Sequence, residues 1–600
     1  MIRKHVSISV CCLLLVMGLD ARAQASADRD KLRMAQTYER SGDLRNAARL
    51  YQELHAASPS LDSYFQGVVR SLQGLQQYAA LTPVVEEQMR IAPSLNTAIL
   101  AGTLYARTGD QEKAQRWWKK AIDISDDDET TYLLIGAEQS QLMLHALALA
   151  SYKSARTING DPLAYCDEIG QLSAMTGDLK TAAREAIAMY GSDGDLVRVQ
   201  RRLGVLLSYE SGSATIATEL ELMTENSPDV LRLRQWFFRQ TRSWQKALEV
   251  TAQLDEQSRP RGQELLLFAD GARMDDQYDV AISAYQILMK DVKDERYRMS
   301  AAYGSARALE QKLRTIQKIT PQEAQAVIDR YDDIISQYGK HPISAEALYH
   351  SAILQDDVLG QMDPARDRLM RLLNQWRGTT VSSDGALRLA DIYLAMGRDD
   401  DAIATLRSIA NGPSVLVSDR SDLARLRLAD LFLWNGNLDS ASAYYSPLAA
   451  NTGSVASNDA LDRLLLINLA QDDSSTVIAI AAAEGLLVRR AYRDAAVRFT
   501  QAAASAKDNE LRDRARLHAA IAYIELNDDL TAEPLLQEIL TSIPETIYGD
   551  RSLQLLADIQ VRRGDTQGAV KTLNSLLVNY PRSILVPSVR DRIRVLRGDA

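Results

Sequence analysis

Small residues, aromatic residues and proline recur along this sequence with a fixed spacing. Pro59 and Pro93 lie 34 residues apart, and each follows a stretch with the apolar periodicity of a helix. The positions that carry the pattern include Ala35, Tyr38, Gly42, Ala47 and Tyr51 in the first unit, Gly102, Tyr105, Gly109, Ala114 and Trp118 in the third, and Ala557, Gly564, Ala569, Leu573 and Pro581 near the C-terminus. A fixed period of this length is typical of an array in which each unit buries its apolar face against its neighbours. The spacing therefore predicts a solenoid rather than a domain with one central core.

Each unit is interpreted as two antiparallel helices. Small residues such as Ala35 and Gly102 let the two helices approach closely, and bulky residues such as Trp118 fill the gap to the next pair. Gly42 is placed to end the first helix, because glycine adopts the left-handed conformation without strain. Asp43 follows directly and can cap the second helix.

Composition agrees with helices and excludes one class of partner. Aromatic residues make up only 6 % of the chain, and proline contributes 15 residues. The formal net charge is −10, and no long basic tract is present. Nucleic-acid binding normally needs a concentrated positive surface, so we expect no nucleic-acid partner.

This pattern resembles the tetratricopeptide repeat family, from about residue 28 to about residue 597 and most strongly at 28–128. The resemblance implies an all-α fold, a right-handed α-α superhelix of about fifteen helix pairs. It also implies that other proteins or peptide segments bind on the concave surface and in grooves between repeats. The segments Tyr331–Ala352 and Leu576–Leu596 are similar to periplasmic repeat proteins of the outer-membrane assembly and Tol–Pal-associated kind.

The chain is expected to have four parts. They are a secretory signal peptide at 1–23, an N-terminal solenoid at 24–260, central repeats with longer loops at 261–450, and C-terminal repeats at 451–600. Residues 295–342 form an overlong unit, and residues 377–385 are interpreted as a longer connection. The pattern of the first helix is poor near 452–475, which predicts a bend or a change of register there.

The first residues have the pattern of an export signal. Arg3 and Lys4 are followed by an almost uninterrupted apolar run from Val6 to Leu19, and then by Ala21-Arg22-Ala23, which signal peptidase reads as small-x-small. Cleavage would leave a mature chain that begins near Gln24. We therefore expect an exported protein, periplasmic or secreted, with no integral membrane span after signal cleavage.

Asp20, close to the cleavage site, leaves open the alternative of an uncleaved anchor. Cys11 and Cys12 lie in the middle of the apolar run, a position that argues against lipidation. Cys166 is then alone in the mature chain, so no internal disulfide is expected. It is interpreted as a packed thiol rather than a nucleophile, because acidic neighbours disfavour a thiolate.

Motifs for catalysis, cofactors or metals are missing from the sequence. It has no phosphate-binding glycine loop, no His-Glu-x-x-His and no paired C-x-x-C, and none of its histidines are spaced for metal binding from one helix. The acidic runs at 126–129 and 399–401 lack the layout of a calcium loop and are interpreted as helix starts. His145 and His518 are expected to be packed. We expect no enzyme activity, no cofactor and no metal.

A group of arginines is the candidate binding site. A stripe of such residues is suited to carboxylates if it faces a groove, whereas the alternative is a set of solvated helix faces. The predicted partner-binding basic patch consists of Arg198, Arg201, Arg202, Arg232, Arg239 and Arg242.

These features predict a non-catalytic extracytoplasmic scaffold or adaptor that binds other proteins, in cell-envelope assembly. The alternative is a helical peptidoglycan-binding superhelix associated with a cell-wall enzyme. The soluble lytic transglycosylases have such a superhelix, followed by a lysozyme-like domain with a catalytic glutamate. Here the repeats are expected to continue to the end of the chain, which favours the scaffold.

Overall fold

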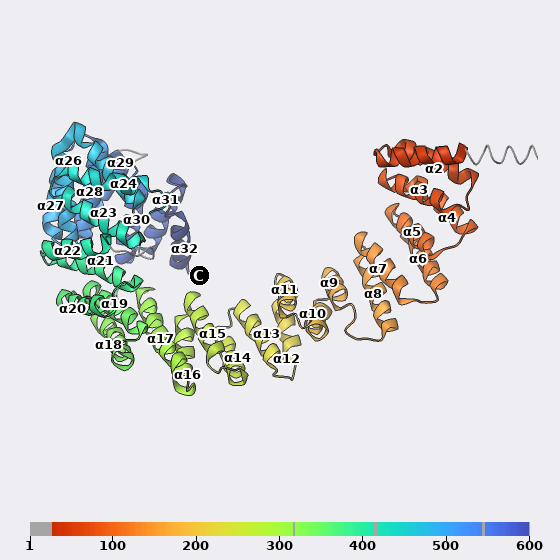
Figure 1. Ribbon diagram of the computed structural model, residues 1–600, viewed down its shortest axis with the longest axis horizontal. Helices are drawn as coiled ribbons and strands as arrows, with labels where there is room; N and C mark the ends of the chain where they lie inside the picture. The colour runs from red at the N-terminus through yellow and green to blue at the C-terminus, as the bar shows by residue number, and fades with distance from the viewer. Residues whose placement is uncertain (1–26, 316–318, 412–417, 543–546, 599–600) are drawn as a thin grey trace, which may run out of the picture. The chain divides into compact units, whose positions relative to one another are not determined.

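A computed structural model describes residues 27–315, 319–411, 418–542 and 547–598, and all the regular structure in these ranges is helical (Figure 1). The chain divides into two compact units, Met1–Ser258 and Arg259–Ala600. The fold is an all-α superhelix, as predicted. The predicted boundaries at 260 and 450 remain predictions.

The first unit begins with the helical residues 27–40. Its further helices are α2 (Leu44–Ala57), α3 (Asp62–Gly74), α4 (Tyr78–Ile91), α5 (Leu95–Arg107), α6 (Gln111–Ser125), α7 (Glu129–Gln141), α8 (His145–Asn159), α9 (Cys166–Met175), α10 (Leu179–Asp193), α11 (Leu196–Leu206), α12 (Gly212–Glu221), α13 (Pro228–Gln240) and α14 (Trp244–Gln257).

The second unit continues the helical array. Its helices are α15 (Gln263–Met274), α16 (Tyr278–Asp291), α17 (Glu295–Thr315), α18 (Pro321–Tyr338), α19 (Pro342–Asp357), α20 (Met362–Gln375), α21 (Thr380–Ala395), α22 (Asp399–Ala410), α23 (Ser418–Trp434), α24 (Leu438–Ala450), α25 (Ser457–Asn468), α26 (Ala470–Val488), α27 (Tyr492–Ser505), α28 (Asn509–Glu525), α29 (Asp529–Ser542), α30 (Gly549–Arg562), α31 (Thr566–Asn579) and α32 (Val586–Arg597).

The turn inside a helix pair is set by a glycine and an aspartate, as predicted. Gly42 and Gly109 have φ of 82° and 90°, in the left-handed region. The aspartates that follow them are N-caps: the side chain of Asp43 accepts from the Asn46 N–H, and the side chain of Asp110 accepts in the same way. Glycine ends one helix and aspartate starts the next, so the chain reverses within three residues.

Packing between helices depends on a small residue that faces an aromatic ring. A Cβ atom built on Gly102 of α5 would lie 2.4 Å from Trp118 Nε1 of α6, so only glycine fits there. Gly67 of α3 lies in the same way against the ring of Tyr51 of α2. These rings stand eight residues after the N-cap of their helix, at a position also occupied by Tyr152, Tyr285, Tyr445 and Phe499.

Ion pairs join side chains about one repeat apart. The separations run from 29 residues for Arg156–Glu185, through 31 for Arg70–Glu39, to 36 for Arg420–Asp384. Exposed pairs of this kind contribute only about 0–1 kcal/mol each. Their main effect is therefore on register, because each pair forms only when its two helices are aligned.

The repeat pattern breaks at Asp473. Helices α25 and α26 are bent by 118° relative to each other, and Asp473 has φ −147° and ψ 65° in the first turn of α26. Its carboxylate accepts from the backbone N–H of Thr476 and of Lys507, which stabilises the break. This confirms the bend predicted near 452–475.

Beyond the bend, the second unit packs back on its own earlier helices. The turn after α26 carries Arg489, which pairs with Asp399 at 2.7 Å, and Arg490, which pairs with Asp356 at 2.7 Å. Asp356 is 1 % exposed and is also paired with Arg388. Nearest-neighbour stacking alone would not place these residues together.

One sequence expectation about loops was wrong. Residues 377–385 were expected to be a connection, but α21 begins at Thr380, because the Thr379 hydroxyl accepts from the Ser382 N–H and caps the helix. The overlong unit at 295–342 is confirmed by the long helices α17 and α18.

Among the described residues, no single helix meets the length and hydropathy of a membrane span. One bent pair, Ser457–Asn468 with Ala470–Val488, meets them by length and composition.

Two glycine substitutions should change stability in opposite directions. Gly102→Ala should destabilise α5 and α6 by about 1–3 kcal/mol, because the new methyl group overlaps the Trp118 ring. Gly204→Ala should stabilise α11 by roughly 0.5–1 kcal/mol, because a Cβ there meets only Trp236 Cζ2, at 4.0 Å. Hydrogen exchange with mass spectrometry can measure each helix separately. Equal effects of the two changes would contradict the packing described.

Candidate functional site

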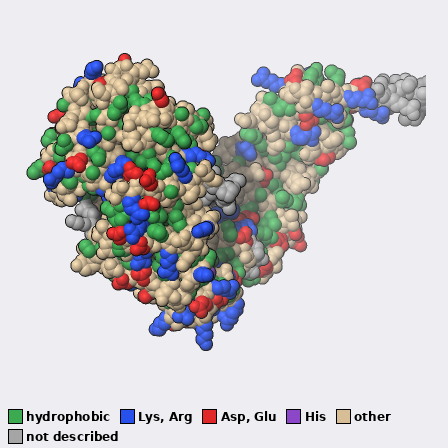
Figure 2. Space-filling model, turned by 60° about the vertical axis from the view of Figure 1, so that its left-hand side comes forward, with side chains coloured by type: hydrophobic (Ala, Val, Ile, Leu, Met, Phe, Trp, Pro, Cys, Tyr) green, Lys and Arg blue, Asp and Glu red, His purple; other side chains and the backbone are tan. Residues whose placement is uncertain are grey.

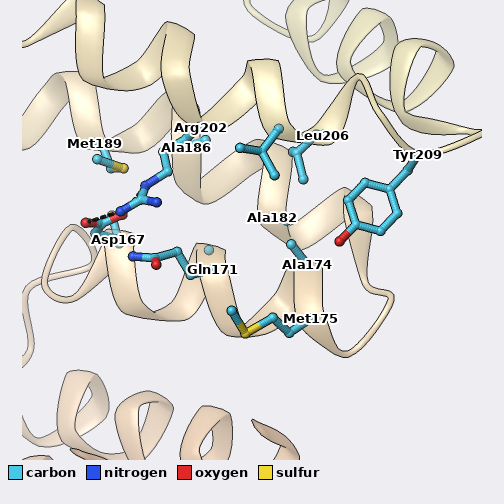
Figure 3. A pocket seen from close by; sticks show the side chains of 13 residues that line it. Asp167, Gln171, Ala174, Met175, Ala182, Ala186, Met189, Arg202, Leu206 and Tyr209 are labelled. Atoms are coloured by element: carbon cyan, nitrogen blue, oxygen red, sulfur yellow. Dashed lines mark hydrogen bonds and ion pairs between the residues drawn. The ribbon is translucent and has the colours of Figure 1, made fainter. Parts of the chain in front are cut away.

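A pocket of about 140 Å³ lies between α9, α10 and α11 of the first unit (Figure 3). Three helices meet there, and small or apolar side chains make most of its walls. The residues that line it are Cys166, Asp167, Gly170, Gln171, Ala174, Met175, Ala182, Ala186, Met189, Arg202, Val205, Leu206 and Tyr209.

A small residue lines this pocket at the position that carries an aromatic ring in six of the helices named above. Gly170 lies eight residues before the N-cap Asp178, as Gly102 lies eight residues before its own N-cap. Eight residues after Asp178 stands Ala186, where α6 has Trp118. Around Gly170 the nearest atoms are therefore Glu185 Cβ and backbone atoms of α10, not a ring.

Apolar side chains are exposed around the opening. Met175, Val205 and Tyr209 are 59 %, 53 % and 40 % exposed. Figure 3 shows Met175 and Tyr209 at one end of the pocket and Asp167 with Arg202 at the other. Exposed apolar groups gathered at a hollow are typical of surfaces that bind a partner.

The polar end of the pocket is an ion-pair cluster. Arg198 Nη2 and Arg202 Nε lie 2.7 Å and 2.6 Å from oxygens of the Asp167 carboxylate. Burial acts to raise the pKa of Asp167, but hydrogen bonds from Arg202 and Arg198 outweigh burial and hold the pKa below its usual value. Asp167 is therefore ionised, and its carboxylate forms ion pairs with both arginines.

The Cys166 thiol, which lines the pocket, is buried. Burial, and next a hydrogen bond with Glu185, raise the pKa of this thiol to about 12. The prediction of a packed, un-ionised thiol is confirmed. Its cause differs from the one expected, because burial and Glu185 dominate rather than the neighbours in sequence.

The six arginines of the predicted basic patch have separate surroundings. Arg198 and Arg202 meet at Asp167, and Arg201 is exposed on the same helix. The other three lie on α13 or just after it: Arg232 pairs with Asp229 at 3.3 Å, Arg239 lies over the Trp244 ring, and Arg242 is in the left-handed turn before α14.

Figure 2 shows basic and acidic side chains interspersed on the face in view. The role of the six arginines in partner binding remains a prediction.

The two acidic runs lie at helix starts, as predicted. Asp128 is the N-cap of α7, and Asp399 begins α22, although neither makes a side-chain capping hydrogen bond. Within the described ranges, no group of three or more histidine, cysteine, aspartate or glutamate residues is arranged to hold a metal ion.

A second hollow, of about 520 Å³ and polar, lies on the second unit between α15, α17 and α19. It is lined by Asp270, Arg273, Ser300, Tyr303, Gly304, Arg307, Ile343, Glu346 and His350. No sequence motif marks these residues as a site, although Glu346 and His350 share one face of α19 at a spacing of four residues.

His350 is held as a neutral acceptor in this polar groove. Arg307 Nη1 donates to His350 Nδ1 at 2.8 Å, and the Tyr331 ring stacks on the imidazole at 6.0 Å between centroids. Burial lowers the pKa of His350 to about 4. Burial also raises the pKa of Glu346. The charged groups that line the groove are two arginines, Arg273 and Arg307, and two acidic residues, Asp270 and Glu346.

His518 is packed, as predicted. Its ring stacks on Phe499 with centroids 5.3 Å apart, and burial lowers its pKa to about 4.

Acid should destabilise the second unit well before its carboxylates are protonated. An unfolded histidine takes up a proton near pH 6.5, whereas folded His350 does so only near pH 4. The contribution of His350 to the free energy of unfolding is complete above pH 6.5 and falls by about 3 kcal/mol as the pH drops to 4. His350→Gln should reduce the loss of unfolding free energy between pH 7 and pH 5, and His518→Gln should reduce this loss further. Urea unfolding followed by circular dichroism at pH 7 and pH 5 measures the free energy of unfolding at each pH. The same loss between the two pH values in His350→Gln and in the wild type would contradict the prediction.

Comparison with known proteins places three segments of the chain in one family. Residues 346–379, 384–411 and 551–583 match the sequence profile described as Tetratricopeptide repeat. These segments correspond to the helix pairs α19–α20, α21–α22 and α30–α31. No curated protein matches the chain.

Several solved structures match along most of the chain, with low identity and low TM-scores. "Structure of Naa15/Naa10 bound to HypK-THB" has 11 % identity and a TM-score of 0.25, and the match covers 95 % of this chain and 96 % of that one. "Crystal structure of APC/C hetero-tetramer Cut9-Hcn1" has 14 % identity and a TM-score of 0.21, with 89 % and 96 % covered. "Crystal Structure of the Yeast Tom70" has 10 % identity and a TM-score of 0.27, with 84 % and 96 % covered.

The profile matches fall in separate parts of the second unit, and each coincides with two antiparallel helices. With the glycine–aspartate turns and the small-residue packing described above, they show that this chain contains tetratricopeptide repeats.

Proposed function

We propose that this protein is an exported, non-catalytic scaffold that binds a segment of another protein, in cell-envelope assembly. Tetratricopeptide repeats support a role in protein–protein interaction, and the pocket between α9, α10 and α11 supports a defined docking place. The observation that carries the proposal is this solvent-open apolar pocket with Met175, Val205 and Tyr209 exposed at its rim.

The proposal assigns no chemical step to the chain. Three of its titratable groups with displaced pKa values lie in packed surroundings. His350 and His518 stack on aromatic rings, and the Cys166 thiol is un-ionised in a packed wall.

Export is supported by the residue pattern before position 24. A basic start, an apolar run and small residues at Ala21 and Ala23 are what a cleaved secretory signal requires.

The mature protein should begin at Gln24. Mass spectrometry of the N-terminal peptide from the native cell measures the start directly, and fractionation measures the compartment. Ala23→Arg should leave the precursor uncut, because signal peptidase requires a small residue at that position. An intact N-terminus on a cytosolic protein would overturn the export part of the proposal.

A partner should be recovered at the rim of the pocket. A photo-crosslinking amino acid at Val205 of the full chain should yield a discrete adduct in intact cells, because this side chain is exposed beside the hollow. The matched control is Val595, an exposed valine on α32 of the other unit, which should yield none. No adduct at position 205, or the same adduct at both positions, would count against the scaffold.

A peptidoglycan-binding superhelix is the second candidate, and the polar groove between α15, α17 and α19 favours it. Tyr303, Arg307 and Glu346 offer a ring face, donors and an acceptor, which suit a glycan with many hydroxyl groups. Under this candidate the chain sediments with purified peptidoglycan, and Tyr303→Ala weakens the association. A chain that stays in the supernatant would rule the candidate out.

A further inference from the structure

We infer that the polar groove between α15, α17 and α19 holds a basic side chain of a partner segment at Glu346, with an oxygen acceptor of the same segment at Arg273. This inference rests on the proposed scaffold function and adds the chemistry of the segment that is bound.

The Glu346 carboxylate, on the α19 side of the groove, has no partner. Among the described residues, none donates a hydrogen bond to it or forms an ion pair with it. The side chain is partly buried, and burial raises its pKa because desolvation disfavours the charged form. A carboxylate that is partly withdrawn from water and left without a partner is destabilising, so a cation that enters the groove has a place to bind.

The charged groups near Glu346 are engaged elsewhere. Arg307 lies 2.6 Å from the buried carboxylate of Glu310, and its charge lowers the pKa of Glu346 without a contact between them. Asp384, whose charge raises the pKa of Glu346, is paired with Arg420 at 2.9 Å. The chain therefore supplies no cation to Glu346.

Glu310 also pairs with Arg314, at 3.0 Å, but Arg314 is not among the residues that line the groove.

Arg273, on the α15 side of the groove, has a donor without an acceptor. Its Nη1 donates to Gln311 at 3.1 Å, whereas its Nε is buried and has no hydrogen-bond partner in the part of the chain that the structure describes. Asp270, one turn earlier, accepts from the Tyr285 hydroxyl at 2.5 Å and forms no ion pair with Arg273. A buried N–H without an acceptor is costly, and an oxygen atom of a ligand would satisfy it.

Glu346 and Arg273 cannot satisfy each other, because α17 lies between their helices. Neighbouring helix axes are about 8–10 Å apart, so the groove from α15 to α19 spans about 20 Å, the length of about six extended residues. Its volume of about 520 Å³ is that of a ligand site.

A protein segment carries both complementary groups. A lysine or arginine side chain supplies the cation for Glu346, and the main chain supplies a carbonyl oxygen at every residue for Arg273. Ser300 and Tyr303, which also line the groove, add hydroxyl groups that can bond to the same main chain. A glycan of neutral sugars has hydroxyl groups but no cation, so the unpaired carboxylate favours the protein segment.

The experiment removes the charge of Glu346 with little change of shape. Glu346→Gln is compared with Asp333→Asn, which removes the same charge from an exposed position of α18. The probes are fluorescent hexapeptides with blocked termini that carry one lysine, one acetyl-lysine or one glutamate in a serine background. Acetyl-lysine keeps the length of lysine but has no charge.

The full mature wild-type chain and Asp333→Asn should bind the lysine probe at least about tenfold more tightly than the acetyl-lysine and glutamate probes, measured by anisotropy. Glu346→Gln should lose this preference. Its melting temperature should stay the same or rise, because the wild-type carboxylate has no partner to lose.

A second variant tests the oxygen acceptor. Arg273→Lys keeps the positive charge but removes the Nε donor, so it should weaken the lysine and acetyl-lysine probes by the same factor, about threefold to tenfold. The preference for lysine should remain. Unchanged binding of both probes would remove Arg273 from the site.

Equal binding of the lysine and acetyl-lysine probes to the wild type would overturn the inference, as would the same preference in Glu346→Gln. A clear fall in the melting temperature of Glu346→Gln would show that Glu346 holds the helices together, and would also overturn it. So would sedimentation with peptidoglycan by a chain that binds no probe, since the groove would then belong to the second candidate.

The failure of this chemistry is separate from the failure of the proposed function. A partner adduct at Val205 with no bound lysine probe would overturn the inference and leave the scaffold standing. No adduct at Val205 and no bound probe together would overturn both.

Discussion

A single pair of helices cannot bury its own apolar face, and the rest of this structure depends on that constraint. Each pair gains its core only from close contact with the next, so the contact must be repeated along the chain. A glycine against an aromatic ring makes this contact between Gly67 of α3 and Tyr51 of α2, and Gly102 and Trp118 pack in the same way inside the pair α5–α6. Stability is therefore distributed, and local irregularities need not unfold the whole array.

Charged side chains contribute to this structure in a different way from apolar packing. Ion pairs about one repeat apart, such as Arg70–Glu39, hold neighbouring pairs in register without adding much stability. Arg490 and Asp356, 134 residues apart in sequence, are another kind of contact, since they exist only because the array bends at Asp473. Buried charges of this kind must be paired, because an unpaired buried charge is strongly destabilising.

The candidate site lies where small side chains replace large ones. Ala186 stands where six other helices have an aromatic ring, and Ala174 and Ala182 also line the solvent-open apolar pocket. A departure from a local rule without internal compensation is the kind of place where function is expected.

The sequence by itself determined the helix pairs and their turns, because these depend on residues close together in the chain. Gly42 and Asp43 specify a turn locally, and their spacing recurs. The arginine cluster was predicted in part: Arg198 and Arg202 share a helix face, but Asp167, which pairs with both, lies one repeat away. Only the tertiary structure decided the pocket at Ala186, since a missing side chain makes a hollow only when three helices surround it.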